Sequence, residues 1–160
     1  MDVIYLDYSK AFDKVDHQTL LAKMKLYGIT GKVYDWIESF LTNRHQAVVV
    51  EGEKSTFQEV KSGVPQGTVL GPVFFILYVI DVVLQIKSFK ALIFADDTKL
   101  MRAITQLLCS TLLQADLDSV IQWSTANNML LHQDKFVVMN YSLNAWSSLR
   151  ELPFTVQGSQ

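Results

Sequence analysis

Residues 91–103 read Ala-Leu-Ile-Phe-Ala-Asp-Asp-Thr-Lys-Leu-Met-Arg-Ala, an apolar run followed by two adjacent carboxylates and a second run. Asp favours turns, so the stretch predicts a strand over residues 91–95, a turn at Asp96 and Asp97, and a returning strand over residues 99–103. Two strands joined by so short a turn pair antiparallel. The stretch therefore favours an antiparallel sheet with two carboxylates at one edge.

Outward from this stretch, strands and helices follow one another without strict alternation. Further strands are expected at residues 3–6, 47–50, 57–60 and 136–140. Four helices are expected: from an Asp16 cap to Tyr27, from Val33 to Leu41, from an opening at Pro72 through an apolar run, and across Leu113 to Ser124. The mixture predicts an α+β fold, an antiparallel sheet backed by helices. Two apolar stripes at helical spacing are expected to face the core: Leu20, Leu21, Met24 and Tyr27 in one helix, and Val33, Trp36, Ile37, Phe40 and Leu41 in the next.

Composition limits the class of protein. A chain of 160 residues with 49% hydrophobic and 19% charged residues is enough for one globular domain. Its one cysteine, Cys109, excludes a disulfide framework. The apolar run from Val69 to Leu84 contains Asp81 and is shorter than the roughly 20 residues that a membrane span needs, so we expect no membrane segment. The net charge of −2 lacks the basic excess usual in proteins that bind nucleic acid.

A third carboxylate, Asp7, follows the predicted strand at residues 3–6. Taken singly, Asp7 can be a helix cap, and Asp96 and Asp97 can be ordinary turn residues. If the strands are neighbours, the carboxylates converge, and two charges about 4 Å apart repel by roughly 4 kcal/mol at an effective dielectric of about 20. Such a cluster is stabilised by divalent cations, and oxygen ligands suit Mg²⁺. Because side chains alternate along a strand, we expect Asp96 to be the better ligand of the pair.

Two further features have both a structural and a functional interpretation. The segment Ser62-Gly63-Val64-Pro65-Gln66-Gly67 places glycines around a Gln amide, which allows the backbone to approach a ligand. It is equally a plain loop at the start of a helix. Lys135 is either a phosphate-binding cation or a solvated surface lysine.

Several segments, in order, resemble the motifs of one polymerase family. They are residues 6–17 (Leu-Asp-Tyr-Ser-Lys-Ala-Phe-Asp-Lys-Val-Asp-His), residues 62–67 continuing through Leu70-Gly71-Pro72, residues 94–100 (Phe-Ala-Asp-Asp-Thr-Lys-Leu), and residues 113–118 with Trp123, Asn128, Met129 and Lys135. These are similar to motifs A, B, C and D of the reverse transcriptases of non-LTR, or LINE-type, retrotransposons. The match extends from residue 3 to residue 141, and it is specific as a combination.

The resemblance implies the palm of a right-hand polymerase, which copies an RNA template by extending a DNA primer with dNTPs. It implies that Asp7, Asp96 and Asp97 hold two Mg²⁺ ions, with Mn²⁺ as a substitute, and that Lys135 reaches the leaving pyrophosphate. It also implies a nucleotide-binding set: the Tyr8 carbonyl, Phe12 as a steric gate against a ribose 2′-OH, Pro65, Gln66, Gly67 and Ala95. Phe12 is also a candidate core aromatic.

We expect residues 1–160 to form a single palm domain from which the fingers and thumb are largely missing. Those segments of the parent polyprotein are then partners of this chain, and the chain alone should have weak or no activity. One alternative is a catalytically dead palm that acts at most as a nucleic-acid or protein binding module. Another is a phosphoacceptor domain, which also clusters aspartates around Mg²⁺, although there the acidic pair precedes the lone aspartate.

Overall fold

The computed structural model describes residues 1–88, 90–95, 97–102 and 108–141. The chain divides into two compact units. The first contains Met1–Ala11 and the chain from Ile80 onward, and the second contains Phe12–Val79. Among the described residues, no helix has both the length and the apolar content needed to cross a bilayer.

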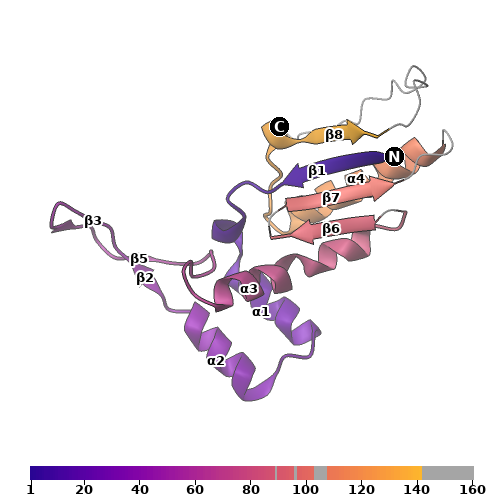
Figure 1. Ribbon diagram of the computed structural model, residues 1–160. Helices are drawn as coiled ribbons and strands as arrows, with labels where there is room; N and C mark the ends of the chain where they lie inside the picture. Colours follow the sequence, from indigo (N-terminus) through magenta and orange to yellow (C-terminus); the bar gives the residue numbers. More distant parts are fainter. Residues whose placement is uncertain (89, 96, 103–107, 142–160) are drawn as a thin grey trace. The chain divides into compact units, whose positions relative to one another are not determined.

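The first unit is built on a four-stranded antiparallel sheet (Figure 1). Its order is β6 (Lys90–Phe94), β7 (Asp97–Arg102), β1 (Asp2–Asp7) and β8 (Val137–Asn140). β1 lies between β7 and β8 and pairs antiparallel with both. The hairpin of β6 and β7 is therefore confirmed, and the strand that ends at Asp7 is its neighbour. The strand ends differ from the prediction, because Ala95 belongs to the turn and Asp97 begins a strand rather than ending a turn.

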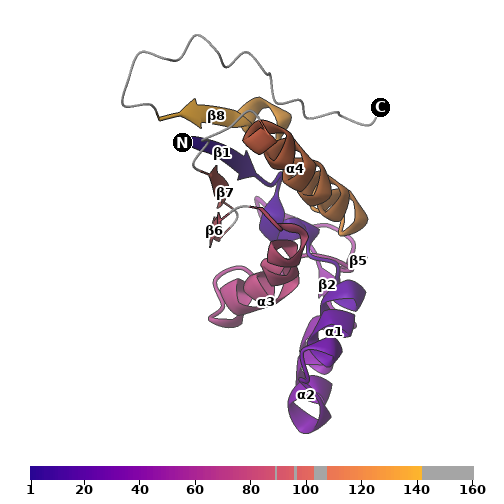
Figure 2. The same cartoon turned by 90° about the vertical axis from the view of Figure 1, so that its right-hand side faces the viewer.

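Helix α4 (Leu108–Ala126) lies along one face of this sheet (Figure 2). Three apolar side chains of α4, Leu113, Leu117 and Val120, are all 0% exposed. Ile4 in β1 and Leu100 in β7 are equally buried, so the core of this unit lies between α4 and the two central strands. Each such side chain contributes about 1.5–3 kcal/mol when it is fully removed from water.

The short helix η2 (Ile80–Gln85) packs against α4 by polar contacts. The indole Nε1 of Trp123 donates a hydrogen bond of 3.1 Å to Oδ1 of Asp81. The buried carboxylate of Asp116 accepts the backbone N–H groups of Lys87 and Ser88, at 3.2 and 2.8 Å. These bonds satisfy carboxylates that would otherwise be costly to bury.

The second unit contains three helices: α1 (His17–Leu26), α2 (Gly31–Leu41) and α3 (Leu70–Val79). The Asp16 cap is confirmed, because its Oδ1 accepts the backbone N–H of Thr19 at 2.8 Å. Leu20 and Met24 are fully buried as expected. Tyr27 is not, since it lies beyond the last turn of α1 and is 40% exposed.

The apolar stripe predicted for α2 is partly wrong. Ile37 and Leu41 are buried, but Val33 and Trp36 are 61% and 55% exposed, and the buried line runs through Tyr34 instead. The Trp36 ring stacks on the ring of Phe40, on the same helix, with centroids 5.4 Å apart. The apolar pattern is wider than the face of α2 that the other helices cover.

α3 also differs from the helix expected to open at Pro72. It begins at Leu70, two residues before Pro72. Phe74, Phe75 and Tyr78 are at most 1% exposed. Val73 and Ile76, on the other side of the helix, are about half exposed. A uniformly apolar sequence cannot tell which of its faces will be covered.

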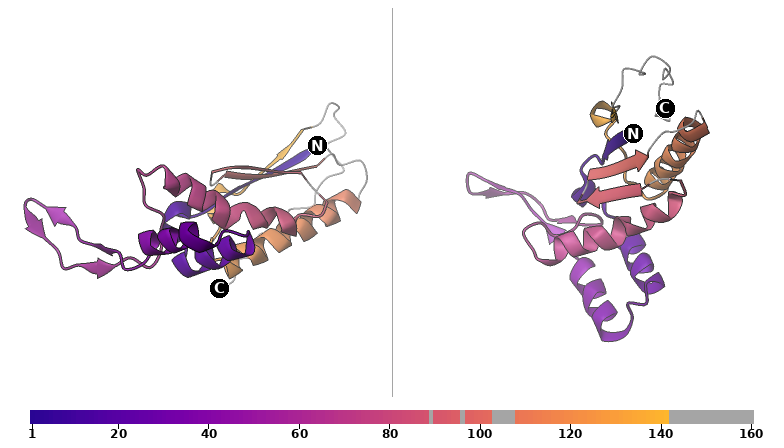
Figure 3. Two further views of the ribbon diagram at one scale, coloured as in Figure 1. Left: turned by 90° about the horizontal axis from the view of Figure 1, so that it is seen from below. Right: turned by 45° about the vertical axis from the view of Figure 1, so that its right-hand side comes forward.

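The predicted hairpin over residues 47–60 is confirmed as a long, narrow arm (Figure 3). It contains two separate ladders: β2 (His45–Gln46) pairs with β5 (Gln58–Glu59), and β3 (Val49–Val50) pairs with β4 (Glu53–Lys54). The tip is thus a tighter turn than predicted, and Lys54 belongs to a strand.

Candidate active site

The pairing register of β1 and β7 places the carboxylates of the candidate site in the first unit. Asp7 is the last residue of β1, and its partner across the antiparallel pair is Asp97. Directly opposed residues have Cα atoms about 4.5–5.5 Å apart and side chains on the same face. Asp97 therefore shares a face with Asp7. Asp96, which the sequence favoured as the ligand, lies outside the described residues.

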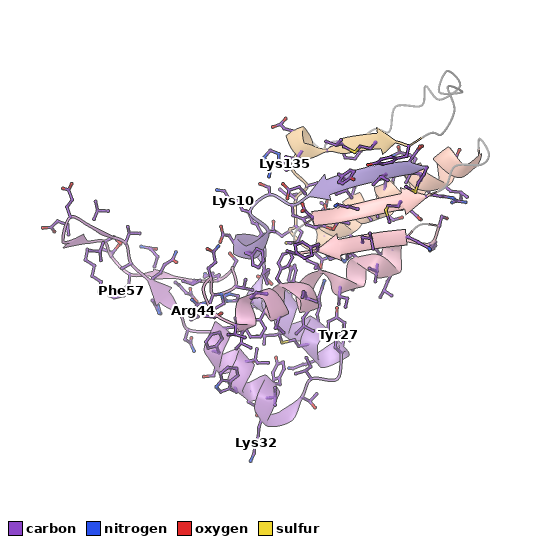
Figure 4. All side chains as sticks on the ribbon, in the orientation of Figure 1. Lys10, Tyr27, Lys32, Arg44, Phe57 and Lys135 are labelled. Carbon is purple, nitrogen blue, oxygen red and sulfur yellow. The ribbon has the colours of Figure 1, made fainter. Side chains whose placement is uncertain are left out.

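The side chain of Lys135, which is far from Asp7 in the sequence, forms an ion pair with it. The Lys135 Nζ lies 2.5 Å from Oδ2 of Asp7, although the two residues are 128 positions apart. The Asp7 side chain is 14% exposed and that of Lys135 is 61% exposed. Figure 4 shows Lys135 beside the end of β1, and Lys10 on the segment that leaves the strand. The ion pair places Lys135 beside Asp7, whereas a role of its ammonium in phosphate binding stays a prediction.

Backbone hydrogen bonds between two segments of the chain bring Lys135 to this position. Residues 130–132 run beside the exit of β1: the Ser9 N–H donates to the Leu130 carbonyl at 2.8 Å, and the His132 N–H donates to the Asp7 carbonyl at 2.8 Å. The short helix η3 (Gln133–Lys135) follows, and the Lys135 N–H bonds back to the His132 carbonyl at 3.1 Å. Sequence reasoning missed this pairing, because residues 130–132 have no strand pattern of their own.

The side chain of Tyr8 belongs to the core beneath the site. It is 3% exposed and lies against Trp123, with ring centroids 6.3 Å apart. Within the described part of the chain, its hydroxyl and that of Thr98 are buried without a hydrogen bond. Burial raises the pKa of Tyr8 to about 12; a weak hydroxyl–hydroxyl interaction with Thr98 lowers this pKa in part, and the Asp81 carboxylate adds to the rise. The Tyr8 side chain is thus part of the core, and a role for the Tyr8 carbonyl in holding a metal stays a prediction.

The donor chemistry at this edge fits a divalent cation. Asp7 and Asp97 supply hard oxygen ligands on one face of the sheet. The Lys135 ammonium on Asp7 shows that a positive charge can be held there. The described residues, which do not include Asp96, contain no group of three His, Cys, Asp or Glu side chains that could hold a metal ion. Two carboxylates of the expected three are thus brought together.

The second unit holds the Pro-Gln-Gly loop against the second half of motif A. The Gly63 N–H donates to the Val15 carbonyl at 2.8 Å, and the Val64 N–H donates to the Phe12 carbonyl at 2.9 Å. His17 is 4% exposed, and its Nε2 lies 2.8 Å from the Gly63 carbonyl oxygen. Three hydrogen bonds therefore fasten the loop to residues 12–17. The role of His17 was missed, and its only sequence signal was its place at the end of motif A.

The same loop fixes its glutamine and the start of α3. Gln66 Nε2 donates to Oδ1 of Asp13 at 3.3 Å. Gly63 has a φ of +92°, which favours glycine, and a Cβ there would lie 3.4 Å from the Asp13 backbone. A Cβ on Gly71 would lie 2.9 Å from the Pro65 carbonyl oxygen. The glycines permit close packing of the loop, whereas a role for Pro65, Gln66 and Gly67 in nucleotide binding stays a prediction.

Two other predicted nucleotide contacts have definite local structures. Phe12 lies in η1 (Ala11–Lys14), half-buried, and its ring stacks on Phe75 with centroids 4.5 Å apart and planes 21° apart. Ala95, the turn residue that follows β6, has a φ of +52°, which is unusual for a residue with a side chain. Both roles stay predictions.

The whole of this arrangement lies within one family model. Residues 3–156 match the model described as reverse transcriptase (RNA-dependent DNA polymerase). The chain belongs to the reverse transcriptase family. Members of this family are RNA-directed DNA polymerases, which are nucleotidyltransferases, and generally use divalent metal ions. The recognition drawn from motifs A to D is thereby confirmed.

Relatives place the chain among the non-LTR retrotransposon enzymes of this family. It is 34% identical over 139 residues to the RNA-directed DNA polymerase from mobile element jockey of Drosophila melanogaster, covering 82% of this chain and 15% of that protein. It is 29% identical to the jockey polymerase of Drosophila funebris, covering 97% and 17%. A third relative is the Pol polyprotein of the type-1 retrotransposable element R2 of Popillia japonica, 38% identical over 46% of the chain and 12% of that protein. The chain thus spans about a sixth of the length of the jockey proteins.

Solved structures show the same fold. The apo telomerase of Candida tropicalis, truncated from its C-terminal domain, superposes with a TM-score of 0.68 at 17% identity, over 90% of this chain and 31% of that one. The telomerase of Candida albicans, solved with a fragment of telomeric RNA, gives 0.66 at 14% identity, over 89% and 27%. The α+β palm predicted from the sequence is confirmed.

Proposed function

We propose that this chain is the palm of a non-LTR retrotransposon reverse transcriptase and contributes the residues that catalyse extension of a DNA primer on an RNA template. One observation carries the proposal. Asp7 of motif A is directly opposite Asp97 of motif C, and Lys135 reaches the same carboxylate. Three charged residues from distant parts of a reverse transcriptase sequence thus meet at one edge of its sheet.

In this proposal Asp7, Asp96 and Asp97 hold two Mg²⁺ ions, which Mn²⁺ can replace, and the Tyr8 carbonyl assists them. When bound, such ions lower the pKa of the primer 3′-OH and neutralise the triphosphate. With cations on Asp7, the Lys135 ammonium would be displaced from that carboxylate and would meet the departing pyrophosphate, as a charge or as a general acid. The Lys135 side chain is 61% exposed, so a phosphate can approach its ammonium from solvent.

The second unit supplies the contacts to the incoming dNTP. Phe12 closes the space that a ribose 2′-OH requires, and Gln66 lies beside the base with Pro65 and Gly67. Ala95 completes the set from the motif C turn. Support comes from the hydrogen bonds that fasten residues 62–66 to residues 12–17, because a loop already ordered loses little entropy when it binds a ligand.

A second candidate is a palm that binds nucleic acid or protein without catalysis. Within this candidate, the net charge of −2 favours a protein partner, because little in the composition supports binding of a polyanion. The first proposal includes a single palm domain over residues 1–160. It also includes four partners: the RNA template, the DNA primer, the fingers and the thumb. The two candidates differ in one measurable property, which is nucleotide transfer.

Primer extension separates them. The chain, at micromolar concentration with Mg²⁺ and dTTP, is given poly(rA) primed with oligo(dT). We expect slow extension that EDTA abolishes and that Asp7→Asn lowers by at least about a hundredfold. Asp118→Asn is the matched control, because Asp118 is an exposed carboxylate on α4 that bonds to Gln114. No extension, or equal extension by Asp7→Asn, refutes the catalytic proposal and leaves the binding module.

A further inference from the structure

Two consecutive phenylalanines of α3 have different partners. Phe74 and Phe75 are both 1% exposed. Phe75 stacks on Phe12, with centroids 4.5 Å apart and planes 21° apart. Phe74 instead meets Phe40 of α2, with centroids 6.2 Å apart and planes tilted by 54°. Phe74 and Phe75 are thus equally buried on the same helix, but they contact different rings, Phe40 and Phe12 respectively.

Phe12 is held from two sides. Its carbonyl accepts the Val64 N–H at 2.9 Å, which fixes the backbone. Its ring is half-buried, with Phe75 against one face, so the ring retains a surface that a ligand can meet. A hydrogen bond to the Phe12 backbone does not fix the rotamer of the Phe12 side chain, whereas a ring stacked on that side chain does. The position of the Phe12 ring therefore depends on Phe75.

We propose that Phe75 determines sugar specificity in this polymerase by acting as a positioning residue, because its stacking on Phe12 fixes the ring that excludes the 2′-OH of a ribonucleotide. The inference rests on the proposed function, in which Phe12 is the gate. Loss of the stack lets the Phe12 ring move away from the sugar. The expected consequence is a loss of discrimination rather than a loss of synthesis.

The test measures the ratio of kcat/KM for dTTP to that for UTP in the same primer-extension assay. Phe75→Leu should lower this ratio by about two- to tenfold, the range that corresponds to one aromatic pair. Phe74→Leu removes an equally buried ring from the same helix and should leave the ratio within about twofold, although it destabilises the fold by a similar amount. Circular dichroism verifies that each variant is folded, and Phe75→Met replaces Phe75→Leu if the latter is not.

The double variant Phe12→Leu with Phe75→Leu adds a second criterion. If Phe75 acts only through Phe12, the double variant has the same ratio as Phe12→Leu alone, since residues that act as one unit are not additive. A ratio unchanged by Phe75→Leu, equal changes in the Phe74→Leu and Phe75→Leu variants, or additive effects would each overturn the inference. These outcomes leave the proposed function intact. An unsubstituted chain that does not extend a primer refutes the proposed function, and the inference falls with it.

Discussion

Replacement of Tyr8 by phenylalanine should stabilise this protein. The Tyr8 hydroxyl is buried and has no hydrogen bond in the described part of the chain, while the ring is packed against Trp123. A buried polar group without a partner costs about 1–3 kcal/mol. Tyr8→Phe removes the cost of the Tyr8 hydroxyl and keeps the ring contacts, while the Thr98 hydroxyl stays buried without a partner. We expect the free energy of unfolding to rise by about 1 kcal/mol at pH 7, after allowance for the small void that the lost oxygen leaves.

The same substitution should change the alkaline stability. The pKa of Tyr8 rises from 10.0 in the unfolded chain to about 12 in the folded protein. Between these values the unfolded chain has lost the proton and the folded chain retains it, so stability falls as pH increases. A shift of this size corresponds to about 3 kcal/mol, lost progressively between about pH 10 and pH 12. Phenylalanine has no such proton, so the advantage of Tyr8→Phe should grow with pH.

Denaturation by guanidinium, followed by circular dichroism at pH 7, 10 and 11.5, measures both effects. Tyr34→Phe is the control, because Tyr34 is also buried but its hydroxyl donates to Oε1 of Glu38 at 3.3 Å. That variant should be no more stable than the unsubstituted chain. If Tyr8→Phe lowers stability at pH 7, or if its advantage does not grow above pH 10, the reasoning from the unpaired hydroxyl is wrong.

Three further substitutions test other contacts. Asp16→Ala should lower the free energy of unfolding by about 1 kcal/mol in a urea titration, because it removes the cap of α1; an unchanged midpoint would contradict the cap. Gly71→Ala should cost about 1–3 kcal/mol in the same titration, because its Cβ would lie 2.9 Å from the Pro65 carbonyl oxygen; a neutral effect would mean that the loop yields easily. Lys135→Met should tighten Mn²⁺ binding severalfold, measured by electron paramagnetic resonance, because the ammonium competes for Asp7; weaker binding would show that Lys135 does not oppose the cation.

Much of the site could be predicted from the sequence, because local rules apply to it. A short apolar run ending in Asp7 and a hairpin around Asp96 and Asp97 are strands by pattern alone, and the order of the motifs identified the family. The Asp16 cap and the buried leucines of α4 followed from helix chemistry. In each of these cases the deciding interaction lies within a few residues of the pattern that predicts it.

The sequence by itself thus determined the elements, the family and the candidate carboxylates. Tertiary structure decided which of these residues meet: that Asp97 is the register partner of Asp7, that Lys135 reaches Asp7 across 128 positions, and that Phe75 rather than Phe74 stacks on Phe12. It also decided which side of α3 is buried. The physical reason is that register, burial and long-range pairing are properties of two surfaces in contact, whereas a sequence pattern describes only one of them.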